Sequence, residues 1–302
     1  MKKLMVILVL IIGCQTLPAQ AWSRNGHMII AAMTYRALPD ALKAEYTALL
    51  RQHPDYEKWA ALHAELRVDI DLGEFLFMRA SVWPDEIRRK GNAYDHPTWH
   101  YTNFPVITDG FPLEETLTPD NDVIFAINES ARILRDASAT KVDQAAHLSW
   151  ILHTIGDIHQ PMHCVALVNL VYPQGDRGGN LFFVRPSENS RGMNLHAYWD
   201  GLLGTSGRIQ DARNDATLLW SQLAAGMEAD VNPDFDVRGW ALEGREIAIT
   251  HVYLEGELDG AVEEARHVAV VLPETYGRRA KSIAQERAVI ASLRLLRVLS
   301  EL

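Results

Sequence analysis

The sequence predicts a single domain built almost entirely of α-helices. Apolar residues recur at helical spacing in several long segments, and only the short stretch 181–184 is expected as a strand. No internal repeat and no low-complexity linker divides the chain. Residues 22–302 are long enough to bury one large hydrophobic core, so we expect one all-α domain over that range.

The first expected helices follow from apolar spacing and from helix start and stop signals. An Ala-rich apolar segment over 27–38 is stopped by Pro39. Thr118 is expected to cap an amphipathic helix that has Pro119 at its first position and runs to Ala137. Its apolar residues keep helical spacing, which predicts one face packed on the core.

Later elements are expected from the same signals. The segment Asp143–Gln160 is more apolar than the others and is ended by Pro161, so it is expected to be a buried helix. Further amphipathic helices are expected over 211–229, 236–254 and 275–300. The Gly- and Pro-rich stretch 172–192 is expected as a loop around the short strand.

Residues 1–21 have the features of a secretory signal peptide. Lys2 and Lys3 precede the apolar run 4–12, and Ala-Gln-Ala over 19–21 is a small-x-small cleavage site. The apolar run is too short to span a bilayer. Cleavage would expose Trp22 as the first residue of a periplasmic or secreted protein. An alternative is lipoprotein processing at Cys14.

The net charge and the cysteine content limit what the protein can bind and how its fold can be stabilised. Removal of the signal peptide moves the formal charge from −10 to −12, which argues against a broad basic face for duplex DNA. Bound divalent cations could still make a local site positive, so net charge alone does not exclude an enzyme that acts on nucleic acid. Cys164 is then the only cysteine, so an internal disulfide is excluded and structural metal is a candidate stabiliser.

Five histidines and three aspartates have the character of metal ligands. A single zinc site takes about three or four protein ligands, so eight side chains suit two or three clustered ions. Clustered zinc is typical of enzymes that hydrolyse phosphoesters or amides. The eight residues are His27, Asp85, His100, His153, Asp157, His163, His196 and Asp200.

Two pairs of these residues have helical i, i+4 spacing, which places both side chains of a pair on one helix face. His153 pairs in this way with Asp157, and His196 with Asp200, while His163 lies just past Pro161. One such pair alone would be read as a hydrogen-bonded pair. Two pairs and a further histidine in an apolar setting favour metal, because burying so many titratable groups without it is costly.

The remaining candidates depend on their surroundings. Asp85 after Pro84 and His100 among aromatic residues are ordinary when each is read alone, and Arg88 matters only if it points into the site. His27 lies five residues beyond Trp22, whose free α-amine and carbonyl oxygen could chelate a metal that His27 also holds.

Together these motifs resemble the zinc-dependent single-strand nucleases, the nuclease S-one/P-one family of moulds, plants and bacteria. The similarity runs from residue 22 to about residue 200. The motifs that carry it are Trp22…His27, Trp83-x-Asp85-x-x-Arg88, His100-Tyr101, His153-x3-Asp157-x-x-Gln160-Pro161-x-His163, Asp176-x-Gly178-Gly179-Asn180 and Asn194-Leu195-His196-x3-Asp200.

The resemblance implies an all-α fold shared with bacterial zinc phospholipase C, with three zinc ions. It implies that Asp157 bridges two of them. The ligands carried over are Asp85, His100, His153 and Asp157 for the first zinc, Trp22, His27 and Asp157 for the second, and His163, His196 and Asp200 for the third.

The resemblance also implies an endonuclease and 3′-nucleotidase that acts on single-stranded DNA, RNA and 3′-nucleotides. A metal-bound hydroxide would attack phosphorus and leave 5′-phosphorylated products; Asp85 and Asp157 would hold the metals. Arg88 and Asn180 would contact phosphate, and Tyr101 would stack on a base. Asn103 stands where fungal members have an aspartate, which leaves base preference open. No stable duplex binding is expected, and the sequence does not indicate an oligomer.

Two other functions compete with this one. A zinc phospholipase C would use similar ligands on a lipid headgroup, but the loop Asp176–Asn180 and Tyr101 match the nuclease version. A non-catalytic zinc-binding protein is the third possibility, and the complete ligand set argues against it.

Overall fold

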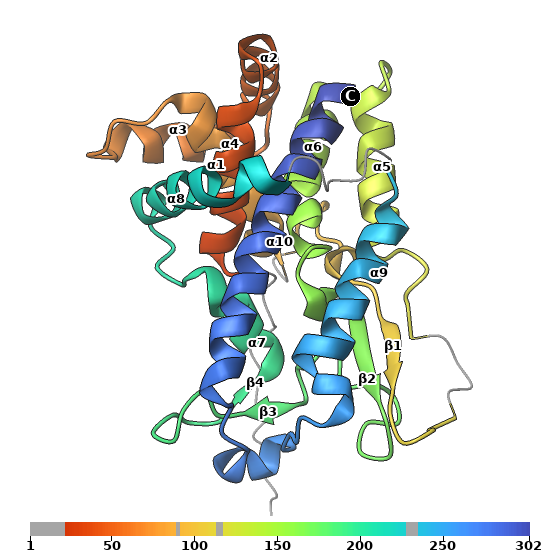
Figure 1. Ribbon diagram of the computed structural model, residues 1–302. Helices are drawn as coiled ribbons and strands as arrows, with labels where there is room; N and C mark the ends of the chain where they lie inside the picture. The colour runs from red at the N-terminus through yellow and green to blue at the C-terminus, as the bar shows by residue number, and fades with distance from the viewer. Residues whose placement is uncertain (1–21, 89–90, 113–116, 228–234) are drawn as a thin grey trace, which may run out of the picture.

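The computed structural model describes residues 22–88, 91–112, 117–227 and 235–302, so the expected signal peptide lies outside the described residues. Helices dominate the fold (Figure 1), which confirms the all-α prediction, and no described helix is long and apolar enough to cross a membrane. The helices are α1 (Arg24–Ala37), α2 (Asp40–Leu50), α3 (Tyr56–Glu65), α4 (Leu72–Ile87), α5 (Val123–Arg135), α6 (Lys141–Asp157), α7 (Leu195–Asp200), α8 (Ile209–Met227), α9 (Val237–Ile247) and α10 (Glu274–Glu301).

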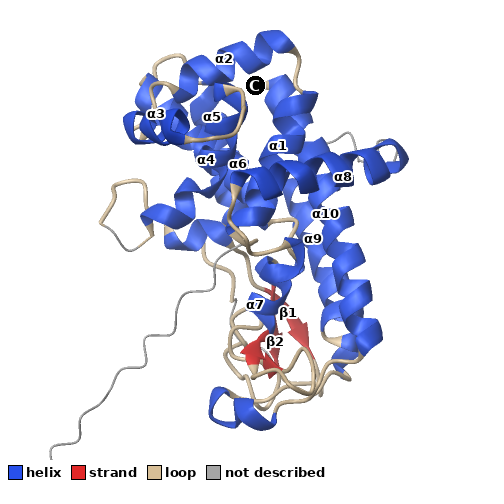
Figure 2. Cartoon of the chain, turned by 90° about the vertical axis from the view of Figure 1, so that its left-hand side faces the viewer, coloured by secondary structure: helices blue, strands red, loops and turns tan. Residues whose placement is uncertain are grey.

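Two very small sheets lie together at one end of the molecule (Figure 2). Strand β1 (Phe104–Ile107) runs parallel to β2 (Val165–Val168), and β3 (Phe183–Val184) runs antiparallel to β4 (Met193–Asn194). The strand expected over 181–184 is therefore confirmed in its second half, whereas β1, β2 and β4 were not predicted.

Helix α6 is the central element of the fold. It packs against α1, α4, α5 and α10, and all residues from Leu148 to Asp157 are buried. A helix enclosed on all sides is expected to be apolar all round. His153 and Asp157 are exceptions to that rule, so their polar groups require partners inside the protein.

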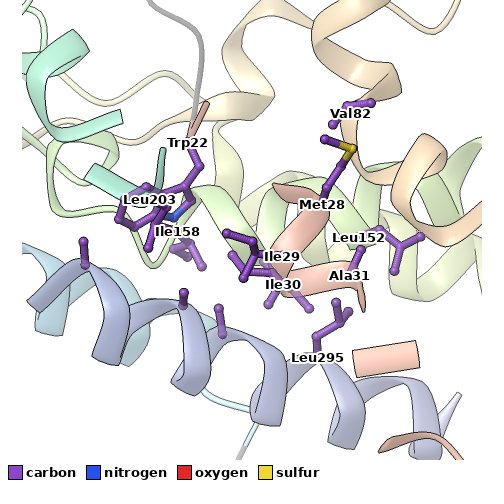
Figure 3. Packing of buried hydrophobic residues seen from close by; sticks show 14 of the residues in the cluster. Trp22, Met28, Ile29, Ile30, Ala31, Val82, Leu152, Ile158, Leu203 and Leu295 are labelled. Atoms are coloured by element: carbon purple, nitrogen blue, oxygen red, sulfur yellow. The ribbon is translucent and has the colours of Figure 1, made fainter. Parts of the chain in front are cut away.

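The start of the described chain is anchored in the core. Trp22 is fully buried, and its indole Nε1 donates to the Gly156 carbonyl at the end of α6, 3.0 Å away. Figure 3 shows Trp22 beside Ile158 and Leu203, close to the start of α1. This packing brings the segment before α1 next to the polar end of α6.

The structure corrects several helix boundaries. Thr118 and Pro119 do not begin a helix: α5 begins at Val123, because the Asp122 carboxylate caps it by accepting from the amides of Ile124 (2.9 Å) and Phe125 (3.0 Å). A side-chain acceptor at this position satisfies amides that the first turn leaves free.

The buried helix and the one expected over 236–254 also end earlier than expected. Helix α6 stops at Asp157 rather than Gln160, because Pro161 disfavours helical backbone before it and starts a 3-10 turn. Helix α9 ends at Ile247 and continues as a π-helical turn over Ala248–Val252. The end of the helix expected over 211–229 lies partly outside the described residues.

Candidate metal centre

The structure gathers all eight candidate ligand side chains into three groups. Within each group the donor atoms lie within 4.8 Å of one another. One group contains His27, Asp85 and His153, the next contains His100, His153 and Asp157, and the last contains His163, His196 and Asp200. The first two groups share His153, so they form one larger cluster.

Four donors of this larger cluster converge on one point. His100 Nδ1 lies 2.9 Å from His153 Nε2, and Asp157 Oδ2 lies 3.3 and 3.1 Å from these two nitrogens. Asp85 Oδ1 stands 3.8 and 3.9 Å from the same nitrogens. Donors bound to one tetrahedral zinc at 2.0–2.1 Å are about 3.3 Å apart, so the spacing fits such an ion.

Asp157 faces two sets of donors at once. Its Oδ2 points to His100 and His153, whereas its Oδ1 lies 3.3 Å from His27 Nε2. The His27 ring stacks on His153 with centroids 4.0 Å apart. A carboxylate placed in this way can bridge two cations.

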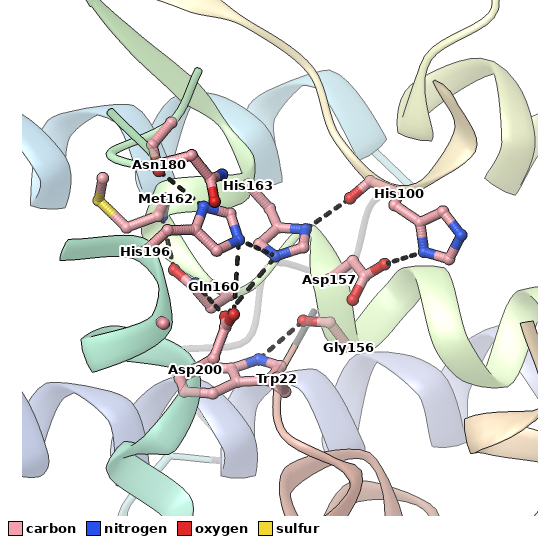
Figure 4. A network of polar contacts seen from close by, with 12 residues as sticks. Trp22, His100, Gly156, Asp157, Gln160, Met162, His163, Asn180, His196 and Asp200 are labelled. Carbon is pink, nitrogen blue, oxygen red and sulfur yellow. Dashed lines mark hydrogen bonds and ion pairs between the residues drawn. The ribbon is translucent and has the colours of Figure 1, made fainter. Parts of the chain in front are cut away.

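The third group lies along the segment that follows α6 and on α7 (Figure 4). His163 Nε2 is 3.0 Å from His196 Nε2, and the Asp200 oxygens lie 3.7 and 3.5 Å from these two nitrogens. The Gln160 amide donates to Asp200 Oδ1 at 2.7 Å, which orients the carboxylate. The i, i+4 pairing of His196 and Asp200 on a helix is confirmed.

Backbone carbonyl oxygens fix the orientation of three of the histidine rings. They accept from the Nδ1 atoms of His153 (Ser81, 2.8 Å), His163 (His100, 2.6 Å) and His196 (Gly178, 2.6 Å). A ring that donates from Nδ1 keeps the Nε2 lone pair free for a metal. In all three rings Nε2 is the atom that faces the other donors.

Several buried nitrogen and oxygen atoms of the candidate ligands have no hydrogen-bond partner. They are His27 Nδ1, His27 Nε2, His100 Nε2, Asp85 Oδ1 and Asp157 Oδ1. Unpaired buried polar atoms are rare and costly in folded proteins. Bound cations would satisfy those that face the clusters, so the residues present fit zinc.

The charges within the site perturb its titration. Burial alone would raise the pKa of Asp157, but the neighbouring His153 and His163 hold it well below its usual range. Burial likewise opposes protonation of His163, yet Asp157 and Asp200 outweigh it and raise the pKa of His163 to about 9. Burial lowers the pKa of His100 to about 4. The histidines are therefore inequivalent, and some hold protons that a metal would displace.

The candidate substrate residues lie around these groups. Arg88 Nη1 is 3.5 Å from Asp85 Oδ1, at the end of α4. Tyr101 is half-buried directly after the 3-10 turn Pro97–His100, and the Asn103 amide donates to the Leu117 carbonyl at 3.0 Å. Asn180 donates to the Arg177 carbonyl at 2.8 Å and stands beside His196 (Figure 4).

The structure reveals contributions that sequence reasoning missed. A Cβ atom on Gly156 would lie 2.9 Å from His27 Nδ1, so the bare backbone allows α1 and α6 to approach. Asp176 is buried and accepts from the Leu167 amide (2.9 Å) and the Tyr253 hydroxyl (2.6 Å), which holds the loop that carries Gly178. The role of Gly156 had one signal in the sequence: it is a glycine in an apolar helix, directly before the ligand Asp157.

Comparisons with known proteins agree with this geometry. The model of the family described as S1/P1 Nuclease matches residues 22–302. Endonuclease 1 of Arabidopsis thaliana is 22% identical over 99% of this chain and 92% of its own length. Endonuclease 5 of the same plant is 25% identical over 67% of this chain and 62% of its own length. Endonuclease 4 is 29% identical over 50% of this chain and 51% of its own length. The chain belongs to the zinc-dependent S1/P1 nuclease family and is a nuclease that hydrolyses phosphodiester bonds.

Proposed function

We propose that this nuclease is an endonuclease and 3′-nucleotidase for single-stranded DNA and RNA, and that its products carry 5′-phosphates. The observation that carries the proposal is the placement of Asp157, whose two oxygens face separate histidine sets, while a third group of candidate ligands lies on the segment after α6 and on α7. Three adjacent cation sites suit the negative charge that spreads over a phosphoryl group during hydrolysis.

The proposed trinuclear centre divides the candidate ligands among three zinc ions. Asp85, His100, His153 and Asp157 would hold the first, and His163, His196 and Asp200 the third. The second would take Trp22, His27 and Asp157. Bound zinc supplies positive charge and lowers the pKa of a coordinated water towards neutrality.

The protein's own groups position the substrate around this centre. We assign phosphate contacts to Arg88, whose guanidinium lies at Asp85, and to Asn180 beside His196. Tyr101 would stack on a base, and Asn103 would offer its carbonyl oxygen, since its amide nitrogen is bonded to the backbone. The side chains of the eight candidate ligands are at most 10% exposed, so we expect a flexible single strand to bring its phosphodiester to them more readily than a stiff duplex.

Export and cleavage after Ala21 complete the proposal. The family match begins at Trp22, and this residue is fully buried against the end of α6. Its freed α-amine and carbonyl oxygen would join His27 in holding the second zinc. Lipoprotein processing at Cys14 would leave that nitrogen in a peptide bond, which weakens this site.

Product analysis tests the proposed function. Protein starting at Trp22 is incubated with single-stranded RNA, single-stranded DNA, a duplex of the same sequence, a 3′-nucleotide and phosphatidylcholine vesicles, with and without a chelator. We expect chelator-sensitive release of 5′-phosphorylated products from the single strands, and of phosphate from the 3′-nucleotide. Failure of the zinc-loaded protein on every nucleic acid, with hydrolysis of the lipid, would favour a phospholipase C instead.

A further inference from the structure

Phe125 is an exposed aromatic residue that ring contacts link to the candidate metal centre, and the proposed function gives it no role. It lies in the first turn of α5 and is 43% exposed. Among the described phenylalanines, only Phe125 and Phe235 are this accessible. A lone exposed apolar residue is ordinary on a protein surface, so the argument depends on what Phe125 touches.

Ring contacts connect Phe125 to the candidate ligand His100. Its ring packs edge-on against Trp99 at 6.0 Å, Trp99 packs on Trp150 at 4.9 Å, and Trp150 packs on His100 at 5.2 Å. Trp99 and Trp150 are buried, so they offer no free face to a ligand. Phe125 is the member of this aromatic series that solvent reaches.

The backbone around Phe125 is tied to the proposed base-binding residue. The Val123 amide at the start of α5 donates to the Tyr101 carbonyl at 3.1 Å. The Asp122 carboxylate accepts from the Phe125 amide itself at 3.0 Å, and α5 packs against α6 and the turn Pro97–His100. Phe125 therefore lies two residues after the α5 residue whose amide is bonded to Tyr101.

The surroundings of Phe125 suit a nucleobase better than a phosphate. Exposed Asn128 lies three residues further on, on the same helix face, and Asn121 is exposed just before the helix. The Asn128 amide nitrogen donates to the Ile124 carbonyl at 2.9 Å, and its carbonyl oxygen can accept from a base edge. Arg132, four residues beyond Asn128, is paired with Glu129 at 2.7 Å. Recognition here would depend on stacking rather than on charge.

We propose that Phe125 is a second stacking position, which binds the base of a nucleotide next to the one held at Tyr101. The inference rests on the proposed function and extends it from one base to a short oligonucleotide. Aromatic stacking tolerates every base, so the position would add affinity for longer single strands without sequence preference.

Kinetics with substrates of different length test this position. Phe125→Ala is compared with Phe125→Trp, which keeps a stacking surface, and with Leu218→Ala, which removes a similarly exposed side chain (51%) from α8. We expect Phe125→Ala to raise KM for a trinucleotide about fivefold or more and to leave KM for a 3′-mononucleotide unchanged. Phe125→Trp and Leu218→Ala should behave like the unsubstituted enzyme, and the salt dependence of KM should not change.

Abasic substrates separate a missing contact from a folding defect. Each base of the trinucleotide is removed in turn, and the effect is measured in the unsubstituted enzyme and in Phe125→Ala. At one position, removing the base should weaken binding to the unsubstituted enzyme but should not weaken binding to Phe125→Ala any further. Equal effects at every position, or an unchanged trinucleotide KM, would overturn the inference alone. An unsubstituted enzyme without activity on any substrate would overturn the proposed function as well.

Discussion

Replacing Gly156 with alanine tests how closely α1 and α6 must approach for the metal centre to form. The new Cβ would lie 2.9 Å from His27 Nδ1 and 3.2 Å from His27 Cε1, whereas ordinary contacts begin at 3.4 Å. The imidazole must therefore retreat by about 0.5 Å, which exceeds the roughly 0.2 Å that a metal–ligand distance tolerates.

The substitution should affect the zinc-free and zinc-loaded proteins differently. Perturbing the support of a ligand typically costs 10–100-fold in metal affinity, or about 1.4–2.8 kcal/mol. Alanine favours helix over glycine by at most about 1 kcal/mol, which offsets the contact when the ring is free to move. We expect weaker binding of the zinc held by His27 and nearly unchanged stability without zinc.

Zinc competition with a chromophoric chelator measures the affinity, and thermal unfolding with excess zinc or excess chelator measures the stability. Gly226→Ala on α8 is the matched control, because a Cβ there meets nothing within 4 Å. Gly156→Ala protein with the zinc affinity of the unsubstituted protein would refute the close-approach argument.

Three further outcomes are expected. Gln160→Leu removes the 2.7 Å hydrogen bond to Asp200 and should lower zinc affinity at the third site 10–100-fold. Dialysis should then remove one zinc ion from the substituted protein. Retention of all its zinc would contradict this. Burial raises the pKa of Asp176 to about 6 from 3.8, so the folded state retains a proton that the unfolded chain releases, and stability falls as pH rises from about 4 to about 6. In chelator-treated protein, Asp176→Asn should abolish this loss of stability, which is at most about 3 kcal/mol. Parallel pH profiles of the unfolding free energy in the substituted and unsubstituted proteins would contradict this. Chelation should lower the melting temperature and added zinc should restore it, since the buried Asp157 carboxylate faces two sets of histidines that a metal would hold together. An unchanged melting curve would count against a buried metal centre.

The all-α class, the buried helix and the pairing of His196 with Asp200 could be predicted from local spacing. The grouping of Asp85 with His153 could not, because it depends on the packing of α4 against α6. The resemblance to a known family, rather than periodicity, placed these distant residues at one site.

The predicted start of α5 was wrong because a different residue caps the helix. Thr118 and Pro119 satisfy the rules for a helix start, but Asp122 provides the acceptor that α5 uses. The pairing of β1 with β2 also escaped prediction, because short strands joined only by tertiary contacts have no distinctive pattern. The role of Gly156 is visible only once α1 lies beside it.

Counting bound zinc ions tests the proposed metal centre most directly. Native mass spectrometry is applied to zinc-loaded protein that begins at Trp22 and to the same protein with Ala21 retained, which places the Trp22 nitrogen in a peptide bond. We predict three zinc ions in the first and loss or marked weakening of one in the second. Two or fewer ions in the protein that begins at Trp22, or the same three tightly held ions in both, would contradict the proposed role of the N-terminus in the centre.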